Sequence, residues 1–491
     1  MRRLLLVFGV ALGLGAQYRG SSWMEPGGTE FVPATGEYED ATGALGIVNA
    51  DGYMETAGHP FFTPLGTNGR ACVSCHQPAN AMSLSVAGLR DRWQTTNGMD
   101  PVFAAVDGSN CPNLPQRDPA SHSLLLNRGL IRVPLAWPPV NADGSAKKVE
   151  FSIEVVHDPT GCNTNAMYGL KSENPTVSVY RRPRPAANLK YVTSGGSRIL
   201  LKNGELSEMD PDTNRPSGMN FMADAREASL LTQARSAVMG HEQAKSAPTR
   251  EQLEKIVAFE SQVYMAQVVD GRIGKLAMPN GPAGLGPLAM RDSKAGVLGD
   301  NTYDPVFKKF EMWLTPGEGQ MASIARGADI FMNRQFWIRD AAHINSIGLG
   351  NPIKRTCATC HNAQMTGQDL SAGWVDVGTT NFPTWTEPST WAESSELPVF
   401  KVTCNKDAAP HPFLGRTIYT TDPGRAMISG KCADVGSIVM QQLRGLSARA
   451  PYFANGAAKT LREVVDFYDR RFDMKLTDGE KDDLINFLGA L

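Results

Sequence analysis

Two pentapeptides of the form Cys-x-x-Cys-His carry the most reactive side chains of the sequence at a regular spacing, and they lie at Cys72–His76 and Cys357–His361. Two thiols at positions i and i+3 of a helical turn can bond to the two vinyl groups of one haem, and the adjacent histidine can ligate its iron. A zinc site would need a second ligand pair nearby, which neither pentapeptide has. The sequence therefore predicts two covalent haem c groups, attached through Cys72, Cys75, Cys357 and Cys360, with His76 and His361 as axial ligands.

Four further cysteines stand alone in the sequence, at Cys111, Cys162, Cys404 and Cys432. Four cysteines allow three disulfide pairings, and sequence alone does not choose strictly between them. The simplest pairing joins Cys111 to Cys162 and Cys404 to Cys432, because each bridge then stays within one half of the chain. Structural disulfides would agree with an oxidising compartment.

The N-terminus predicts export. A basic start, Met1–Arg3, precedes the apolar run Leu4–Leu14 and the small residues Gly15 and Ala16, which is the pattern of a secretory signal. We expect the signal over residues 1–20 and a periplasmic location, with an uncleaved anchor as the alternative because Leu14 fits poorly before the cleavage site. No later stretch is apolar for long enough to span a bilayer.

Length and composition limit the classes of protein that remain. The chain has 491 residues, 42% hydrophobic and 20% charged, which suits two or three folded domains rather than disorder or a coiled coil. The formal net charge is -2, without long runs of one sign. A nucleic-acid partner therefore has no electrostatic support.

We expect the secondary structure that holds the two motifs to be mostly helical. Helical periodicity runs over Ala223–Val269, and a capping pattern predicts a final helix from Thr477. Alternation at Phe151, Ile153 and Val155, and again at Val177, Val179 and Arg181, predicts a small β-hairpin. The predicted fold is mainly α, with two cytochrome c-like haem domains over 21–300 and 301–491 and the hairpin inserted in the first.

The C-terminal segment Leu443–Gly456 reads LRGLSARAPYFANG. It resembles the segment that follows the second haem in the bacterial di-haem cytochrome c peroxidases and MauG. Thr460–Tyr468, Phe61–Gly69 before the first pentapeptide and Thr421–Arg425 after the second resemble the same family. The resemblance is good around both haem motifs and weak over Gly271–Asp300.

The resemblance implies that one haem meets peroxide or dioxygen while the other, usually six-coordinate, holds or relays electrons. The family's distal Met falls at Ala448 and the histidine that follows its Pro-Tyr-Phe triplet falls at Ala454, and neither alanine can bind iron. The second haem is then five-coordinate or recruits another side chain. The nearest candidates in sequence are Met427, Met440, Tyr452 and His411.

The open haem departs from the family as well. The catalytic Gln and Glu of the family align with Phe221 and Leu231, neither of which can move a proton. His241 is the candidate substitute, but the interpretation that we favour for it is a capping or packed histidine; His122 and His157 are weaker candidates. The family's inter-haem tryptophan could correspond to Trp93, Trp137, Trp313 or Trp337, and local sequence does not choose among them.

The predicted function is a periplasmic di-haem c oxidoreductase, peroxide-dependent like the cytochrome c peroxidases. The alternatives are a MauG-like or rubber-oxygenase-like enzyme acting on a protein or organic substrate, and a non-catalytic electron carrier. The implied partners are peroxide or dioxygen and a small donor protein such as a cytochrome c or cupredoxin, and a homodimer stays open. The resemblance also implies a calcium ion, for which the carbonyls of Thr421 and Pro423 are candidate donors.

Overall fold

The structure is a computed structural model. It describes residues 23–141, 144–193, 199–200, 206–207, 209–210, 215–216, 221–293, 309–315, 317–344, 350–361, 374–383 and 395–491. The predicted signal over 1–20 and the predicted boundary at residue 300 lie outside the described residues.

The expectation of a mainly α-helical fold is wrong, because the structure is only 32% helical and 20% strand. Many of its strands are two or three residues long, and strands of that length carry little periodic signal. The helices are α1 (Val86–Thr96), α2 (Ala105–Gly108), α3 (Ser123–Arg128), α4 (Leu189–Val192), α5 (Leu230–His241), α6 (Arg250–Gln262), α7 (Gly286–Asp292), α8 (Gly319–Asn333), α9 (Cys357–Cys360), α10 (Ala426–Ser429), α11 (Leu461–Phe472) and α12 (Asp478–Gly489).

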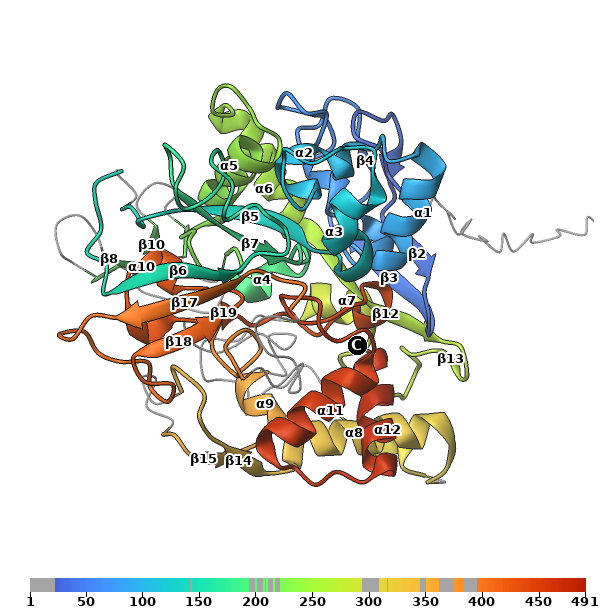
Figure 1. The fold of residues 1–491 in the computed structure, drawn as a ribbon. Coiled ribbons are helices and arrows are strands. Elements are labelled where there is room, and N and C mark those ends of the chain that lie inside the picture. The colour runs from blue at the N-terminus through green and yellow to red at the C-terminus, as the bar shows by residue number, and fades with distance from the viewer. Residues whose placement is uncertain are drawn as a thin grey trace, which may run out of the picture.

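The strands form small antiparallel sheets, of which the largest described ones have the orders β13-β12-β3-β2 and β18-β17-β6. Figure 1 shows β6, β17 and β18 between a group of helices that includes α1, α5 and α6 and a group formed by α8, α11 and α12. The strands are β1 (Phe31–Val32), β2 (Thr35–Glu39), β3 (Gly43–Asn49), β4 (Met54–Glu55), β5 (Ile131–Ala136), β6 (Phe151–His157), β7 (Thr176–Arg181), β8 (Ile199–Leu200), β9 (Leu206–Ser207), β10 (Met209–Asp210), β11 (Arg215–Pro216), β12 (Val263–Asp270), β13 (Gly274–Lys275), β14 (Phe336–Ile338), β15 (Ile353–Arg355), β16 (Trp374–Val375), β17 (Val399–Cys404), β18 (Thr417–Thr420) and β19 (Ile438–Val439).

The two strands of the expected hairpin are present, as β6 and β7, but they do not pair with each other. β6 pairs with β17, and β7 pairs with β5. The connection between β6 and β7 is too long for a tight hairpin turn, and it is tied to another part of the chain by a disulfide from Cys162 to Cys111. The predicted hairpin is therefore wrong, although both of its strands are correct.

The β6–β17 pair joins segments that are far apart in the sequence. Ile153 lies opposite Val402, and both pack in one apolar cluster with Val179 of the neighbouring sheet. The second described disulfide, Cys404–Cys432, begins at the end of β17. The division at residue 300 stays a prediction, but segments from either side of it share a sheet and a core. The two disulfides follow the pairing that the sequence analysis considered simplest.

The predicted helical stretch over Ala223–Val269 is also shorter than expected. α6 ends at Gln262, and β12 begins at Val263 as the central partner of β3. The first five residues of β12 are all buried, and such a continuous apolar run cannot be told from a buried helix by periodicity. Both helices before it begin with a capping box, at Ser229 and Thr249.

The C-terminal helices pack closely on one another. α12 begins after Thr477, whose side chain accepts from the amide of Glu480, as its capping pattern predicts. Gly327 allows α8 to approach α12, because a Cβ there would lie 2.0 Å from the carbonyl oxygen of Asp483. Arg326 binds the Asp483 carboxylate at 2.7 Å across the same contact. Among the described residues, no helix is long and apolar enough to cross a membrane.

A buried arginine at the end of β7 connects distant parts of the chain. Arg181 donates through Nε and Nη2 to both carboxylate oxygens of Asp422, at 2.6 and 2.9 Å, and through Nη1 to Asp224 at 2.5 Å. Arg226 also binds Asp224, at 2.8 Å. All three members of the Arg181 network are at least nine-tenths buried, so the charges compensate one another away from water.

We expect Arg181→Met to lower the free energy of unfolding by about 3–5 kcal/mol, because it leaves the buried carboxylate of Asp422 without its cation and that of Asp224 with Arg226 alone. Urea unfolding followed by circular dichroism measures the change. Arg250→Met, which removes an exposed pair with Glu254, is the matched control and should change stability by less than about 0.5 kcal/mol. Equal stability of Arg181→Met and the parent protein would show that the buried network does not stabilise the fold.

Candidate haem sites

The first Cys-x-x-Cys-His motif begins on a short 3-10 helix, Cys72–Ser74, and its histidine is already oriented. Nδ1 of His76 lies 3.0 Å from the carbonyl oxygen of Met82. A hydrogen bond at that position makes Nδ1 the protonated nitrogen and leaves the lone pair of Nε2 for a metal. Backbone contacts therefore prepare this histidine for iron ligation.

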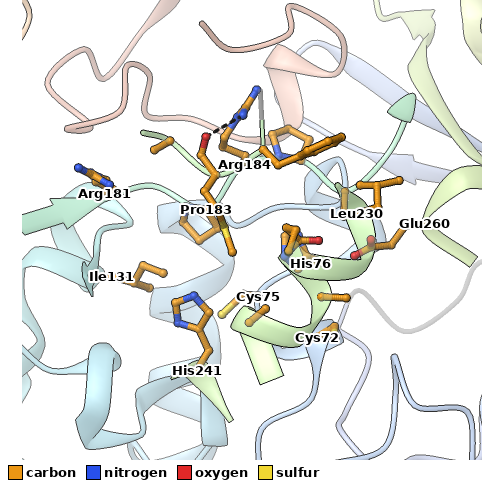
Figure 2. A pocket seen from close by; sticks show the side chains of 18 of the residues that line it. Cys72, Cys75, His76, Ile131, Arg181, Pro183, Arg184, Leu230, His241 and Glu260 are labelled. Carbon is orange, nitrogen blue, oxygen red and sulfur yellow. Dashed lines mark hydrogen bonds between the residues drawn. The ribbon is translucent and has the colours of Figure 1, made fainter. Parts of the chain in front are cut away.

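A buried cavity opens beside this motif, and Figure 2 shows Cys72, Cys75, His76 and His241 gathered around it. Helix α5 contributes one face, at positions three or four residues apart, as expected for a helix that packs along a planar group. The α5 residues that line the cavity are Leu230, Gln233, Ala234, Ala237 and His241.

The second motif forms α9 and lines a second cavity, which is strongly apolar. Nε2 of His361 lies 3.4 Å from the hydroxyl of Tyr468, and burial raises the pKa of that hydroxyl above its ordinary value. No Asp or Glu is among the residues that line this cavity in the described part of the chain. Its apolar lining includes Phe331, Phe336, Ile338, Val375, Leu446, Phe453, Leu461, Phe472 and Leu488.

The two cavities share one wall, formed by Arg182, Pro183, Gln441 and Gln442. Arg182 is 7% exposed and donates to the carbonyl oxygens of Leu84 and Arg449, at 2.6 and 2.8 Å. Burial, together with the nearby Arg449, lowers the pKa of Arg182 to about 9.

Arg449 strengthens the cationic character of this wall. It is 5% exposed and lines the second cavity, and burial lowers its pKa to about 10. No described carboxylate bonds to Arg182 or Arg449. Buried guanidinium groups are stable with anionic partners, and haem propionates are such anions, so the shared wall fits two haems whose acid groups meet there.

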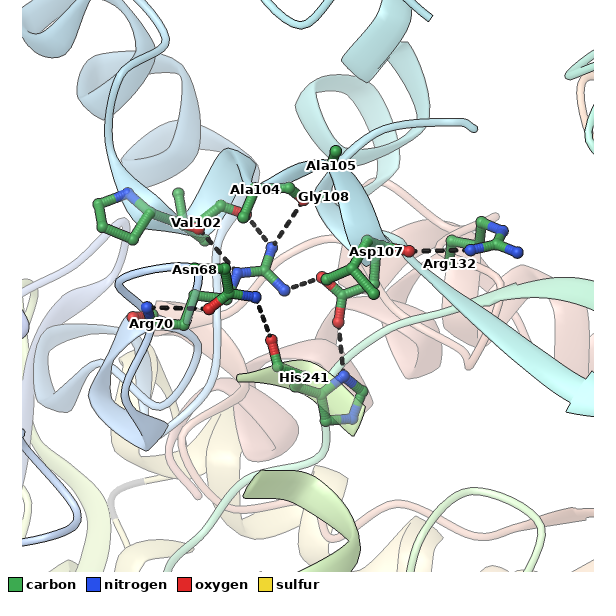
Figure 3. Close-up of polar contacts among 12 residues, drawn as sticks. Asn68, Arg70, Val102, Ala104, Ala105, Asp107, Gly108, Arg132 and His241 are labelled. Atoms are coloured by element: carbon green, nitrogen blue, oxygen red, sulfur yellow. Dashed lines mark hydrogen bonds and ion pairs between the residues drawn. The ribbon is translucent and has the colours of Figure 1, made fainter. Parts of the chain in front are cut away.

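The structure places His241 at the first cavity, at the C-terminal end of α5. Its Nδ1 lies 2.5 Å from Oδ2 of Asp107, and Asp107 in turn pairs with the fully buried Arg70 (Figure 3). Burial and the positive charges of Arg70 and Arg226 lower the pKa of His241 to about 3. We infer a neutral imidazole that donates Nδ1–H to Asp107, which leaves Nε2 as a proton acceptor.

Two carboxyl groups at the same cavity were missed in the sequence. Glu242 follows His241, accepts from the amide of Leu65 at 2.9 Å and lies 3.7 Å from the Sγ of Cys72. Glu260 lies on α6, is 3% exposed, and its Oε2 makes no hydrogen bond within the described chain. Burial raises the pKa of Glu242 to about 7 and that of Glu260 to about 8. The spacing of Glu260 from Ile256, which also lines the cavity, could have indicated it.

The structure describes all four positions at which this chain lacks a catalytic or ligating side chain of the family. Phe221 lines the first cavity and Leu231 packs in the adjoining core. Ala448 packs in that same N-terminal core, whereas Ala454 lines the second cavity. The alanine at 448 thus contributes to the contact between the two halves of the chain.

The four candidate distal ligands divide into two pairs. Met440 and Tyr452 line the second cavity. Met427 packs in the core beside β17, and His411 lies 3.3 Å from the buried carboxylate of Asp376; neither of them lines one of the two haem cavities. Met440 and Tyr452 therefore stay candidates on geometric grounds.

The other candidate side chains lie elsewhere. His122 bonds through both ring nitrogens to backbone carbonyls, and His157 bonds to the carbonyl of Ser395. None of Trp93, Trp137, Trp313 and Trp337 lines either haem cavity. Trp337 is instead 54% exposed.

The region expected to hold calcium contains the buried cation of Arg181. The carbonyl of Pro423 accepts from the amides of Gly436 and Ala426, and the neighbouring Asp422 is bound by Arg181. Within the described residues, no cluster of three His, Cys, Asp or Glu side chains could hold a metal ion. An arginine thus supplies a positive charge beside the Thr421–Pro423 segment.

Comparison with known proteins supports the resemblance seen in the sequence. The chain is 28% identical over 154 residues to cytochrome-c peroxidase IdrP1 of Pseudomonas sp. (strain SCT), covering 28% of this chain and 37% of that relative. No family model matches the chain. The match, with the two haem motifs, supports a likeness to the di-haem cytochrome c peroxidases and MauG. The chain spans little more than a third of the length of that relative.

One solved structure is also similar. It is described as a MauG-like protein associated with microbial copper homeostasis, at 13% identity and a TM-score of 0.27, with 62% of this chain and 82% of that chain covered. An overlap this slight carries no argument about the fold or the function. The likeness to the family rests on the curated relative and on the motifs.

The raised pKa of Glu260 makes stability depend on pH. Because its folded pKa, about 8, lies above the ordinary value of 4.5, its stabilising contribution is complete below pH 4.5 and is lost as pH rises through 8. We expect Glu260→Gln to become more stable than the parent protein, by a few kcal/mol, as pH rises from about 5 to about 8. Urea unfolding at both pH values measures this, with exposed Glu254→Gln as the control; parallel curves for Glu260→Gln and the parent would contradict a protonated Glu260.

Proposed function

We propose that this chain is an exported di-haem c oxidoreductase that reduces hydrogen peroxide to water. The observation that carries the proposal is that each Cys-x-x-Cys-His motif lines its own buried cavity and that the two cavities share a wall. This arrangement suits a protein in which one site meets the oxidant and the other supplies electrons. The curated relative, which is named a cytochrome c peroxidase, supports the same class of reaction.

Each cavity has the residues to hold one haem. Cys72 and Cys75 would attach the first and Cys357 and Cys360 the second, while His76 and His361 would ligate iron. The buried guanidinium groups of Arg182 and Arg449 would neutralise propionates at the shared wall. When bound, haem iron supplies the redox centre at which peroxide accepts electrons.

The titratable groups favour the first cavity as the site of the reaction. Reduction of one peroxide molecule to two water molecules consumes two electrons and two protons, so groups that hold and transfer protons are needed. His241, Glu242 and Glu260 line the first cavity, and the second has no Asp or Glu in its described lining. We assign proton transfer to the first cavity, with His241 as acceptor, and electron supply to the second, where Met440 or Tyr452 is the candidate sixth ligand.

The predicted signal over residues 1–20 supports a periplasmic location, and the two disulfides agree with an oxidising compartment. The electrons would come from a small donor protein such as a cytochrome c or cupredoxin. The buried Arg181 network favours a link between the two halves that needs no calcium ion.

The number of haems is the first test. We expect two haems per chain in the pyridine haemochrome assay, and a matching mass increase that survives denaturation because the attachment is covalent. Cys357→Ala with Cys360→Ala should leave one haem, and Cys111→Ala with Cys162→Ala is a control in which both haems stay. A purified protein that loses all its haem on denaturation would exclude the covalent attachments.

The reaction with peroxide is the second test. Optical and electron paramagnetic resonance spectra should show one iron that responds to stoichiometric peroxide, and turnover should oxidise two one-electron donors per peroxide. His241→Ala should slow peroxide consumption by about 10²–10⁴-fold if it transfers protons. Half-buried His157 of β6, which lines neither cavity, serves as the control, and His157→Ala should leave the rate unchanged. Two low-spin irons that ignore peroxide would favour the electron-carrier alternative.

A second function is favoured by the apolar second cavity. A haem enzyme acting on an organic substrate, as the rubber oxygenases do, needs an apolar pocket, and Phe, Leu, Val and Ile side chains dominate this lining. This alternative predicts that an apolar organic molecule changes the spectrum of the second haem. Peroxide consumption without any such change would favour the peroxidase.

A further inference from the structure

The hairpin formed by β14 and β15 covers one side of the second haem cavity. The two strands pair antiparallel, with Trp337 opposite Lys354 and Ile338 opposite Ile353. Figure 1 shows the hairpin beside α9, the helix that carries the second Cys-x-x-Cys-His motif. Arg355, the last residue of β15, is two residues before Cys357.

Side chains of β14 alternate between the cavity and the outer surface. Phe336 and Ile338 are buried and line the second cavity, whereas Trp337 between them is 54% exposed. Successive side chains on a strand point to opposite faces, so a single layer of backbone separates the indole from the cavity. The outer face of the hairpin is therefore the nearest solvent surface that β14 provides to that cavity.

An exposed tryptophan is unusual in this molecule. Of the tryptophans whose burial is described, Trp337 is exposed, whereas Trp23 and Trp313 are at most 9% exposed. Tryptophan and arginine are the residues most enriched where proteins bind partners, since a flat ring fills area at little entropic cost. Trp337 thus marks a contact surface rather than a packing position.

The charge around Trp337 is positive. Arg339, Lys354 and Arg355 are exposed and form no ion pair within the described chain, and Asp340 is the single acidic residue on the two strands and their immediate ends. Two other cations, by contrast, are neutralised by ion pairs: Arg334 binds Glu480, and Nζ of Lys475 lies 3.7 Å from the carboxylate of Asp473. The net charge of the whole chain is -2, so this excess of cations is local.

We propose that the outer face of the β14–β15 hairpin docks a small acidic electron-carrier protein, with Trp337 at the centre, Arg339 and Lys354 on the same face, and Arg355 at the edge of the hairpin where β15 ends. The proposal rests on the proposed function and names the surface through which its electrons enter. Each reduced carrier gives up one electron and leaves oxidised, so two carriers and two protons match the reduction of one peroxide to two water molecules. A small aromatic centre with a cationic rim suits a transient complex, which must dissociate after each electron.

The charge excludes the more usual basic carrier. A basic cytochrome c would meet two like charges at this face and a third at its edge, and like charges across an interface oppose association. An acidic cupredoxin or an acidic cytochrome c presents the complementary sign. Complementary charge raises the association rate and makes it fall with salt, which separates this docking mode from purely apolar contact.

Binding, rather than turnover, tests the proposal. Surface plasmon resonance of the di-haem protein against an acidic cupredoxin should show binding that weakens steeply with salt, and a basic cytochrome c should bind at least about tenfold more weakly. Lys354→Glu with Arg355→Glu should weaken binding of the acidic probe by about tenfold or more at low salt, and Trp337→Ala by about tenfold. The matched controls are Lys171→Glu, an exposed cation elsewhere, and Tyr53→Ala, an exposed aromatic residue; neither should change the affinity.

The outcomes separate the docking surface from the proposed function. Unchanged binding in the hairpin variants, or preference for the basic cytochrome c, would overturn the docking surface even where the protein still consumes peroxide with a small-molecule reductant. Equal binding of vesicles that carry anionic lipids would also overturn it, because a membrane would then be the better partner. Peroxide inertness with every reductant, together with intact salt-dependent binding of the cupredoxin, would instead overturn the peroxidase function and leave the docking surface in place.

Discussion

Two consecutive arginines at the end of β7 link the two haem cavities to the fold. Arg181 is bound by Asp224, from the segment before α5, and by Asp422, from the segment after β18, so one guanidinium fixes two distant loops. The next residue, Arg182, lies in the wall that both cavities share. Because β7 is itself paired with β5, the position of this wall follows from a sheet and not from a flexible loop. A buried charge needs its partners in place, and this requirement makes the two halves depend on each other.

The haem motifs could be predicted from sequence because their chemistry is local. Cys72, Cys75 and His76 lie within five residues, so their spacing alone predicts the attachment, and the disulfide pairing followed from keeping each bridge within one half of the chain. The capping pattern at Thr477 is local in the same way, and α12 begins where it predicts. The fold class could not be predicted in this manner. β6 finds its partner in β17, far along the chain, and nothing in the alternation of Phe151, Ile153 and Val155 specifies which strand lies beside it.

The candidate site shows the same division. His241 was a candidate from the sequence because histidine commonly transfers protons near neutral pH, but its partner Asp107 comes from α2, and only the folded chain joins them. Glu260 was missed because it lies in an amphipathic helical stretch, and a carboxylate in such a helix is expected on the exposed face. Its burial on the cavity side of α6 is a tertiary property. Sequence periodicity can place a residue on a helix face, but it does not say which face meets a cavity.

The absence of an acid or base at Phe221 and Leu231, where the resemblance would place them, has a physical consequence for the first cavity. Phe221 gives the first cavity an apolar lining and Leu231 packs in the core beside it, while the end of α5 and the neighbouring α6 bring His241, Glu242 and Glu260 to the cavity from other positions. A low dielectric keeps an uncompensated carboxyl protonated, and the same burial keeps the imidazole of His241 neutral. A protonated acid and a neutral base in one cavity are the two states that proton transfer to peroxide would require under the proposed function. With Phe221 and Leu231 in place of the acid and base, the first cavity still holds titratable groups, and burial sets which of them carry a proton.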